Sequence, residues 1–481
     1  MPNTPNIPRR QFLQTASATA ATVALTSSQA TAEEKPKRRP NVVFLLADQW
    51  RAQATGYAGN SIVETPHLDA LARQSVNFTN AVSGCPVCCP YRGSLMTGQY
   101  PLTHGVFLND VCLSSDAFSL AEAFNAAGYH TGYVGKWHLD GQGRASFIPP
   151  ERRQGFQYWR AAECTHNYNK SIYYADDPEK LFWKGYDAID QTEDARHYLR
   201  DHRDEPFALV LSWGPPHNPY QTAPEAFRKR FRAEDMQLRP NVPEEMVDAA
   251  RNDLAGYYAH CAALDVCAGR IIDELDELGL AEDTILVFTS DHGDMIGSQG
   301  NQRKQRPWDE AIRVPFLVRY PRLLGSGAKE ITLPINAPDI MPTLLGLCGI
   351  DVPDTVEGTD RTDLITGKAP DGDEAALITC PSPFGEWTRP KGGREYRGIR
   401  TRRYTYVRTL DGPWLLYDNQ ADPYQMNNLV GKPEHAALQA ELETMLTARL
   451  KETKDHFRPG GEYIAKWGYT VDAHGTVPYT H

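Results

Sequence analysis

The sequence predicts an α/β protein with a large, mostly parallel or mixed sheet sandwiched by helices, and a smaller C-terminal α+β domain built on an antiparallel sheet. Four short apolar runs, separated by helical segments, are typical of strands buried on both faces. Each run is followed by polar side chains, and in open α/β sheets ligands bind beyond the carboxyl ends of the strands. A stretch rich in Gly, Pro and Asp around residues 368–374 then precedes shorter strands.

The first strand is predicted over residues 41–46, a continuous apolar run that leads to Asp48 and Gln49. The next helix is predicted to begin with Thr65 as its N-cap and Pro66 at the first helical position, because the missing N–H of proline costs nothing there. This strand therefore delivers two polar side chains to one edge of the sheet.

Three further strands of the large sheet are predicted, with helices between them. The strands cover residues 129–135, 207–211 and 284–289, and the helices cover 119–127 and 246–278. The polar residues that follow these strands include Lys136, His138, His217, Asp291 and His292. Because parallel strands end at the same edge of a sheet, we expect these side chains to lie near one another and near those that follow the first strand.

The chain is predicted to divide into an α/β domain over residues 38–370 and an α+β domain over residues 375–481. In the second domain, residues 396–409 and 414–417 are predicted to be strands of an antiparallel hairpin. A helix is predicted over residues 434–451.

Composition and charge exclude some classes of partner. The chain has 481 residues, of which 41% are hydrophobic and 23% charged, as in an ordinary globular protein. Its formal net charge of -11 argues against nucleic acid as a partner, and an anionic substrate would need a local basic pocket. The nine cysteines cannot all pair within the chain because their number is odd.

The first 32 residues are predicted to be an export signal. Residues 9–13, Arg-Arg-Gln-Phe-Leu, resemble a twin-arginine motif, and a modestly apolar run to Leu25 precedes a small-residue cleavage site at residues 30–32. The apolar run is too short to span a bilayer. We therefore expect a protein carried by the export machinery to the periplasm or the extracellular space, without stable membrane insertion.

The stretch around Cys88 carries the strongest chemical signal. Pro90 suits the first position of a helix, which places Cys88 just before a helix N-terminus, where anions are favoured. Arg92 lies about one turn further on, and Gly98 is a plausible stop. A nucleophile at an anion site is predicted. The alternatives are a buried or disulfide-bonded cluster, or redox or metal chemistry at the Cys-x-x-Cys of Cys85 and Cys88, although no second such pair completes a zinc site.

The run Cys88-x-Pro90-x-Arg92, followed by Leu-Met-Thr-Gly at residues 95–98, resembles the signature of the sulfatase family in the alkaline-phosphatase-like superfamily. The resemblance implies that a separate maturation enzyme oxidises Cys88 to Cα-formylglycine, whose hydrate is the nucleophile. It extends from residue 41 to residue 429, and it implies that the α/β domain is the catalytic domain of a sulfuric ester hydrolase.

A metal site is predicted where Asp48 and Asp291 end buried strands, since paired carboxylates there suit a hard divalent cation. The resemblance implies one Ca²⁺ ion, with the residue at position 88 and the neighbours Gln49 and His292 as further ligands. Many members of the family have Asp in place of Gln49 and Asn in place of His292. The ligand charge is therefore lower here, and a nitrogen ligand is unusual for calcium.

Basic side chains at other motif positions complete the implied catalytic set. The Gly-Lys-x-His motif falls on Lys136 and His138, and family positions also fall on His217 and Lys304. The resemblance implies that Arg92, Lys136 and Lys304 hold the sulfate charge. His217 with Lys304 would protonate the departing alcohol, and His138 would take the proton whose loss expels sulfate. Asp291 could help to activate the attacking hydroxyl.

A sulfated carbohydrate is the predicted substrate, ahead of choline sulfate or small aryl sulfates. Residues expected to line an outer pocket are His166, Tyr168, Trp183, Arg303, Arg306, Trp308 and the loop at 384–391. Aromatic side chains among them suit sugar rings.

Three alternative functions are considered. A phosphonate monoester or phosphodiester hydrolase of the same superfamily could use the same nucleophile. A two-zinc phosphatase would want Ser or Thr where Cys88 stands, and more His and Asp ligands. An inactive protein that binds sulfated glycans would be expected to have lost Cys88, a metal carboxylate or His138, and all are present.

Overall fold

The structure is a computed structural model that describes residues 39–370, 372 and 374–478. The predicted export signal at residues 1–32 lies outside the described residues. From Pro40 onward the chain forms one compact unit. In the part of the chain that is described, no helix is both long enough and apolar enough to cross a membrane.

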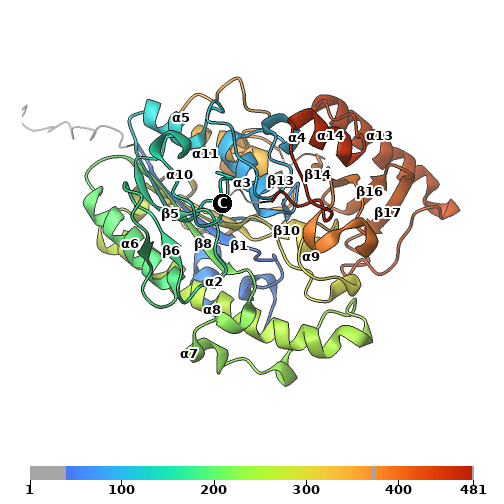
Figure 1. The fold of residues 1–481 in the computed structure, drawn as a ribbon, viewed down its shortest axis with the longest axis horizontal. Coiled ribbons are helices and arrows are strands. Elements are labelled where there is room, and N and C mark those ends of the chain that lie inside the picture. Colours follow the sequence, from blue (N-terminus) through green and yellow to red (C-terminus); the bar gives the residue numbers. More distant parts are fainter. Residues whose placement is uncertain (1–38, 371, 373, 479–481) are drawn as a thin grey trace, which may run out of the picture. The chain divides into compact units, whose positions relative to one another are not determined.

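An eight-stranded mixed sheet forms the centre of the α/β region (Figure 1). Its spatial order is β12 (Lys329–Ile331), β2 (Val76–Phe78), β11 (Phe316–Arg319), β9 (Thr284–Ser290), β1 (Asn41–Asp48), β8 (Phe207–Pro216), β4 (His130–Lys136) and β5 (Tyr158–Ala162). The five strands from β9 to β5 are parallel, and β11 is antiparallel to β9. The four predicted strands are therefore neighbours, and their carboxyl ends meet at one edge.

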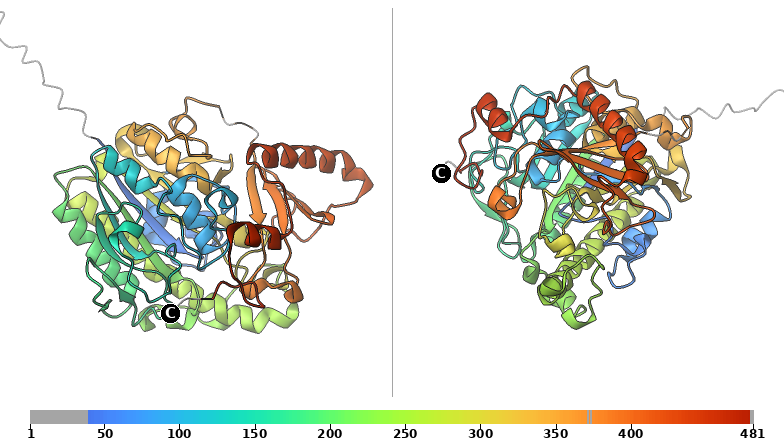
Figure 2. Two further views of the ribbon diagram at one scale, coloured as in Figure 1. Left: turned by 45° about the horizontal axis from the view of Figure 1, so that its top comes forward. Right: turned by 90° about the vertical axis from the view of Figure 1, so that its right-hand side faces the viewer.

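Helices cover both faces of this sheet (Figure 2). Successive residues of β1 alternate between two cores, with Val42 and Phe44 on one side and Val43 and Leu45 on the other. The first core contains α3 (Cys88–Thr97), α5 (Leu120–Ala126) and α11 (Ala337–Cys348), and the second contains α2 (Pro66–Ala72), α6 (Asp187–Asp201) and α8 (Val247–Glu277). Burial on both faces explains the unbroken apolar runs of the sequence.

The C-terminal region contains a four-stranded antiparallel sheet in the order β14 (Ala376–Cys380), β15 (Tyr396–Arg400), β16 (Tyr404–Thr409) and β17 (Gly412–Asp418). Helix α13 (Ala436–Glu452) packs on one face, and residues of the α/β region pack on the other. The single strand predicted over 396–409 is wrong. It is two strands, because the Thr401 hydroxyl accepts the N–H groups of Arg403 and Tyr404 and closes a turn.

The remaining α-helices and strands are short. They are α4 (Pro101–His104), α7 (Glu225–Arg228), α9 (Asp309–Ile312), α10 (Pro321–Leu324), α12 (Thr362–Thr366), α14 (Gly460–Trp467), β3 (Ala81–Val82), β6 (Ile172–Tyr173), β7 (Leu181–Phe182), β10 (Arg313–Val314) and β13 (Ile335–Asn336).

Two predicted helix starts need correction. Helix α3 begins at Cys88 with Val87 as its N-cap, so Pro90 is its third residue and Cys88 belongs to its first turn. Proline is tolerated there because the first N–H groups of a helix have no intrahelical acceptor. The helix ends at Gly98, with φ 66°, as predicted. Thr65 does not cap α2, because its hydroxyl donates to the Asp69 carboxylate instead.

Candidate active site

Three buried charges form the floor of the site. Asp48 ends β1, Asp291 follows the neighbouring parallel strand β9, and Arg92 points between them from α3. Arg92 Nη2 lies 3.2 Å from Asp48 Oδ2 and 3.1 Å from Asp291 Oδ2, and none of the three side chains is more than 1% exposed. Two carboxylates at this depth would repel each other strongly, so the guanidinium is needed to keep them together.

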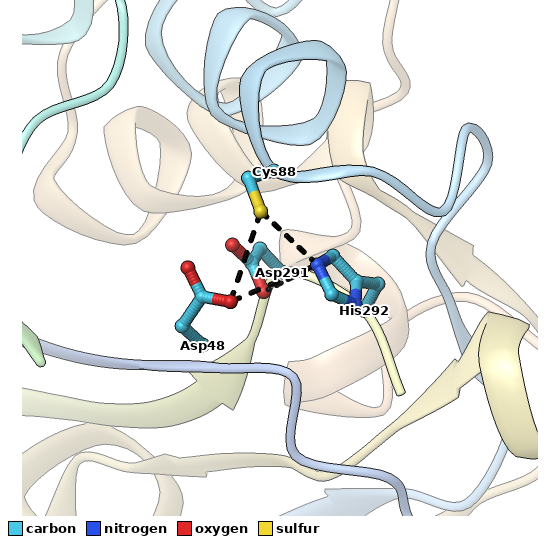
Figure 3. A group of neighbouring side chains, drawn as sticks. All are labelled: Asp48, Cys88, Asp291 and His292. Carbon is cyan, nitrogen blue, oxygen red and sulfur yellow. Dashed lines mark hydrogen bonds and ion pairs between the residues drawn. The ribbon is translucent and has the colours of Figure 1, made fainter. Parts of the chain in front are cut away.

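Cys88 stands above these carboxylates at the first turn of α3 (Figure 3). Its Sγ lies 3.2 Å from Lys304 Nζ, 3.3 Å from His292 Nε2 and 3.7 Å from Asp48 Oδ1. Burial and the charge of Asp48 raise the pKa of the thiol, but Lys136, Lys304 and His292 lower it well below its ordinary value. Position 88 therefore stabilises a negative charge on its side chain.

The donors around Cys88 fit a divalent cation. One ligand atom from each of Asp48, Cys88, Asp291 and His292 lies within 4.8 Å of the others. The Gly293 carbonyl can only accept a hydrogen bond, so His292 Nδ1 donates to it over 2.9 Å. In the neutral imidazole, Nε2 then carries the lone pair and turns it toward the other candidate ligand atoms. The set is rich in carboxylate oxygen, with a single nitrogen.

Gln49 is held so that its oxygen also faces this cluster. Its Nε2 donates to Asp294 Oδ2 over 2.6 Å, which leaves Oε1 at 3.3 Å from Lys304 Nζ. Its backbone is left-handed, with φ 71°, and its own N–H donates to Asp291 Oδ1 over 3.0 Å. A non-glycine residue in this conformation persists only where its surroundings enforce it, as this hydrogen-bond pattern does.

Lys304 and His217 form a close pair beside Cys88. Lys304 Nζ lies 2.8 Å from His217 Nε2, and His217 Nδ1 donates over 2.8 Å to the Asn218 carbonyl. Burial and the charge of Lys304 hold the pKa of His217 well below its ordinary value. His217 is therefore neutral, its Nε2 accepts from the ammonium, and the mobile proton of the pair is on Lys304.

Lys136 and His138 reach different partners. The strand ends at Lys136, whose Nζ lies 2.6 Å from Asp48 Oδ2. His138 is left-handed, with φ 62°, and its Nε2 lies 2.7 Å from Asp110 Oδ1. The backbone is not extended across these residues, because the strand ends at Lys136 and the chain turns before His138. Both nevertheless line one pocket with Cys88.

This pocket has a volume of about 190 Å³. Its lining comprises Cys88, Asn109, Asp110, Lys136, His138, Arg144, His166, His217, Lys304, Gln305, Phe384, Gly385, Glu386 and Thr476. Six of these side chains are Lys, Arg or His, which supplies the local basic surface that an anionic substrate needs in an acidic protein.

The outer-pocket predictions were largely wrong. Only His166 and the start of the 384–391 loop line the pocket. Tyr168 and Trp183 are buried in the core behind it, Arg303 donates to the Tyr220 hydroxyl, Arg306 is buried against the Lys304 carbonyl, and Trp308 packs on Trp414. Asn109, Asp110, Arg144, Gln305 and Thr476 were missed, because they lie on irregular segments with no fixed spacing to a motif.

Fold and site together fit a hydrolase of charged esters, because a buried cysteine at a helix N-terminus lies beside a basic pocket and above carboxylates that could hold a divalent cation. The Sulfatase family profile matches residues 40–350, and the profile of the C-terminal region of N-sulphoglucosamine sulphohydrolase matches residues 297–452. The chain belongs to the sulfatase family, and it is a sulfuric ester hydrolase.

Several known proteins and one solved structure are similar to this chain. An ulvan-active sulfatase of Formosa agariphila is 47% identical over 92% of this chain and 87% of its own length. An endo-4-O-sulfatase of Bacteroides thetaiotaomicron is 31% identical over 86% of this chain and 92% of its own. The crystal structure of the sulfatase-like protein yidJ from Bacteroides fragilis aligns with a TM-score of 0.80 at 31% identity, covering 90% of this chain and 99% of that one.

Proposed function

We propose that this sulfatase removes sulfate from a sulfated carbohydrate, with Cα-formylglycine made from Cys88 and one Ca²⁺ ion. The observation that carries the proposal is the position of Cys88 Sγ, within 3.7 Å of Lys304, His292 and Asp48 and on the wall of the basic pocket. The names of the two similar enzymes, an ulvan-active sulfatase and an endo-4-O-sulfatase, support the carbohydrate class.

The ion would be held by Asp48, Gln49, Asp291, His292 and the modified residue 88, and it would supply positive charge for a sulfate oxygen. Formylglycine at position 88 supplies, as its hydrate, one hydroxyl that attacks sulfur and a second that can later lose its proton. Arg92 orients both carboxylates, and Lys136 neutralises Asp48, so the site carries little net negative charge against an incoming sulfate.

Departure of the alcohol requires a proton at the ester oxygen as the S–O bond breaks. Lys304 is the donor that the geometry favours, since its ammonium lies 3.2 Å from Cys88 Sγ and its partner His217 is a neutral acceptor. The His217 imidazole would hold this ammonium in place and share its proton.

Release of sulfate requires a base for the second hydroxyl of residue 88. His138 stands at the motif position for this base, and its Nε2 is held by Asp110 over 2.7 Å. Burial lowers the pKa of His138, but Cys89, Cys164 and the hydrogen bond with Asp110 raise it well above its ordinary value, so a proton that His138 took from the hydroxyl would be stabilised there. As the proton leaves the hydroxyl, the C=O double bond forms, the bond from carbon to the sulfate oxygen breaks, and water then hydrates the aldehyde again. An unmodified serine or cysteine has no second hydroxyl for this elimination.

The leader and the domain division are parts of the same proposal. A twin-arginine signal over residues 1–32 would export a folded enzyme that the maturation enzyme has already modified in the cytoplasm. Its destination would be the periplasm or the extracellular space. Residues 38–370 would form the catalytic domain and residues 375–481 the C-terminal domain, whose Phe384, Gly385 and Thr476 line the pocket.

The test is sulfate release measured by ion chromatography, after production together with a formylglycine-generating enzyme. Sulfated polysaccharides and their oligosaccharides are compared with phosphonate monoesters and phosphodiesters, and Cys88→Ala is the control. Release of sulfate from glycans by the wild type alone supports the proposal. Faster phosphonate or phosphodiester cleavage favours that hydrolase instead. Glycan binding without release of sulfate by the matured protein makes it a binding protein.

A further inference from the structure

A short segment beside the pocket binds the backbone next to His138 and stacks on the His217 ring. It comprises Glu163, Cys164, Thr165 and His166, directly after β5, and is called the 163–166 segment here. Cys164 and Glu163 are buried, and His166 reaches the pocket. No motif marks these residues, and the reaction described above does not use them.

Glu163 binds the backbone that follows His138. Its carboxylate is fully buried and accepts the N–H groups of Leu139 at 3.1 Å, Asp140 at 2.9 Å and Gly141 at 2.7 Å. Three successive amides around one carboxylate form a compact anion nest. The nest fixes the direction in which the chain leaves His138.

This support matters because His138 has a strained backbone. Its φ of 62° lies in the left-handed region, which costs a non-glycine residue about 1–3 kcal/mol unless the surroundings enforce it. Asp110, which binds the His138 ring, is also left-handed, with φ 66°. Asp110 orients the ring, and Glu163 holds the backbone that carries it.

His166 supports the other histidine through its ring. The imidazoles of His166 and His217 are stacked, with centroids 4.5 Å apart and planes inclined by 3°. The edge of the His217 ring is fixed by two hydrogen bonds, to Lys304 at Nε2 and to the Asn218 carbonyl at Nδ1. Hydrogen bonds at the edge leave the ring free to tilt about the line between them, and a parallel ring against its face prevents that tilt.

We infer that the 163–166 segment is a positioning element for both proton transfers, with Glu163 acting through His138 and His166 acting through the His217–Lys304 pair. The inference rests on the proposed function. His138 serves the release of sulfate and His217 serves the departure of the alcohol. Substitutions of Glu163 and His166 should therefore slow different steps, which kinetic measurements can tell apart. Loss of Glu163 slows sulfate release, and loss of His166 slows departure of the alcohol.

The Glu163 arm uses Glu163→Gln and Glu163→Asp with 4-nitrophenyl sulfate. Misplacing His138 is expected to lower steady-state kcat by about 10–100-fold while the first turnover stays fast, so a stoichiometric burst of nitrophenol precedes slow turnover. Asp265→Asn is the matched control, because Asp265 is a buried carboxylate that accepts two backbone N–H groups, from His67 and Leu68, away from the pocket. Glu163→Asp keeps the charge and should recover part of kcat.

The His166 arm uses substituted phenyl sulfates, which differ in the pKa of the leaving phenol but bind alike. His166→Ala is expected to make log kcat/KM fall more steeply with leaving-group pKa, losing about 10–100-fold for the most basic phenol and little for nitrophenol. His166→Phe restores a flat ring against His217 and should recover part of the loss. His202→Ala removes a stack with His130 at 3.8 Å elsewhere in the molecule and is the matched control.

Two results would overturn the inference. One is a Glu163→Gln variant that loses kcat without a burst, as a merely destabilised protein would. The other is a His166→Ala variant with the wild-type dependence on leaving-group pKa. Failure of the proposed function is distinguished by the matured wild type, which would then release no sulfate from glycans or would cleave phosphonates or phosphodiesters faster, whereas failure of this inference leaves wild-type sulfate release intact and changes only the behaviour of the variants.

Discussion

Nζ of Lys304 lies 2.8 Å from Nε2 of His217, and the hydrogen bond at the other nitrogen of the ring decides which of the two carries the proton. His217 already donates from Nδ1 to the Asn218 carbonyl, so its Nε2 accepts from the lysine ammonium. His217, which the family resemblance implies as part of the general acid, is therefore neutral. The positive charge of the pair is on Lys304, beside Cys88.

Substitution of Lys304 therefore tests which residue donates the proton. Lys304→Met is expected to lower kcat/KM by about 10²–10⁴-fold for sulfates of alcohols, and by much less for nitrophenyl sulfate, whose phenolate departs without a proton. Steady-state kinetics on the two substrate classes measure the difference. Arg303→Met is the control, because it removes the neighbouring positive charge, which binds the Tyr220 hydroxyl and not Cys88 or His217. An equal loss for both classes would show that Lys304 serves only to bind sulfate.

Metal dependence should follow the ligand geometry. Asp291→Asn removes a charged donor and is expected to abolish activity at any Ca²⁺ concentration. Asp294 is not itself a candidate ligand, and its carboxylate accepts from Gln49 as well as from the Tyr220 hydroxyl and the Arg303 backbone. Asp294→Asn therefore loosens Gln49 without removing a ligand, so we expect about 10–100-fold weaker Ca²⁺ affinity with activity restored at high Ca²⁺. Titration of Ca²⁺ into chelator-treated protein, followed by activity and by bound-metal analysis, measures both. Full activity of Asp291→Asn in the presence of chelator would contradict the metal site.

Gly135 has no room for a side chain. Its φ is 106°, and an added Cβ would lie 2.0 Å from the Ser212 carbonyl oxygen on the neighbouring strand. Gly135→Ala should lower the free energy of unfolding by about 3–5 kcal/mol, because the two strands must separate. Gly185→Ala, at φ 66° with open space around it, should cost about 1 kcal/mol from strain alone. Urea denaturation compares the two, and similar losses would disprove the steric account.

Buried histidines should destabilise the protein in acid. Burial lowers the pKa of His104 from 6.5 to about 3. Since the folded pKa lies below the unfolded one, its contribution to stability is complete above pH 6.5 and is lost progressively as the pH falls toward 3. Urea denaturation across this range should show a shallower acid loss for His104→Gln than for the wild type. His456→Gln, at an exposed position, should leave the slope unchanged, and an unchanged slope for both would contradict the assignment.

The parallel part of the fold could be predicted from the sequence because its signal is local and redundant. Strands β1, β4, β8 and β9 are buried on both faces, so each is an apolar run, and each ends in polar residues that share one sheet edge. That edge gathers the motif residues, including Asp48 and Asp291. Strand β14 was missed because its five residues follow a linker and pair only with distant β15.

The outer pocket could not be predicted, because burial there depends on tertiary packing. Trp183 and Tyr168 have the composition of a sugar-binding surface, yet both fill the core, with Trp183 stacked on Tyr173. Asp110 and Arg144 reach the pocket from loops whose paths no periodicity sets. The left-handed turn at His138 was likewise hidden, since Glu163, which holds it, lies 25 positions later in the sequence and at no motif position.

The state of residue 88 is the central claim, and mass spectrometry of one tryptic peptide tests it most directly. The peptide of residues 74–92 contains Cys88 and ends at Arg92. After production with an active formylglycine-generating enzyme, we predict an aldehyde at position 88 and none at Cys85 or Cys89. An unmodified thiol at position 88 under those conditions, in a protein that still released sulfate, would contradict the proposed nucleophile.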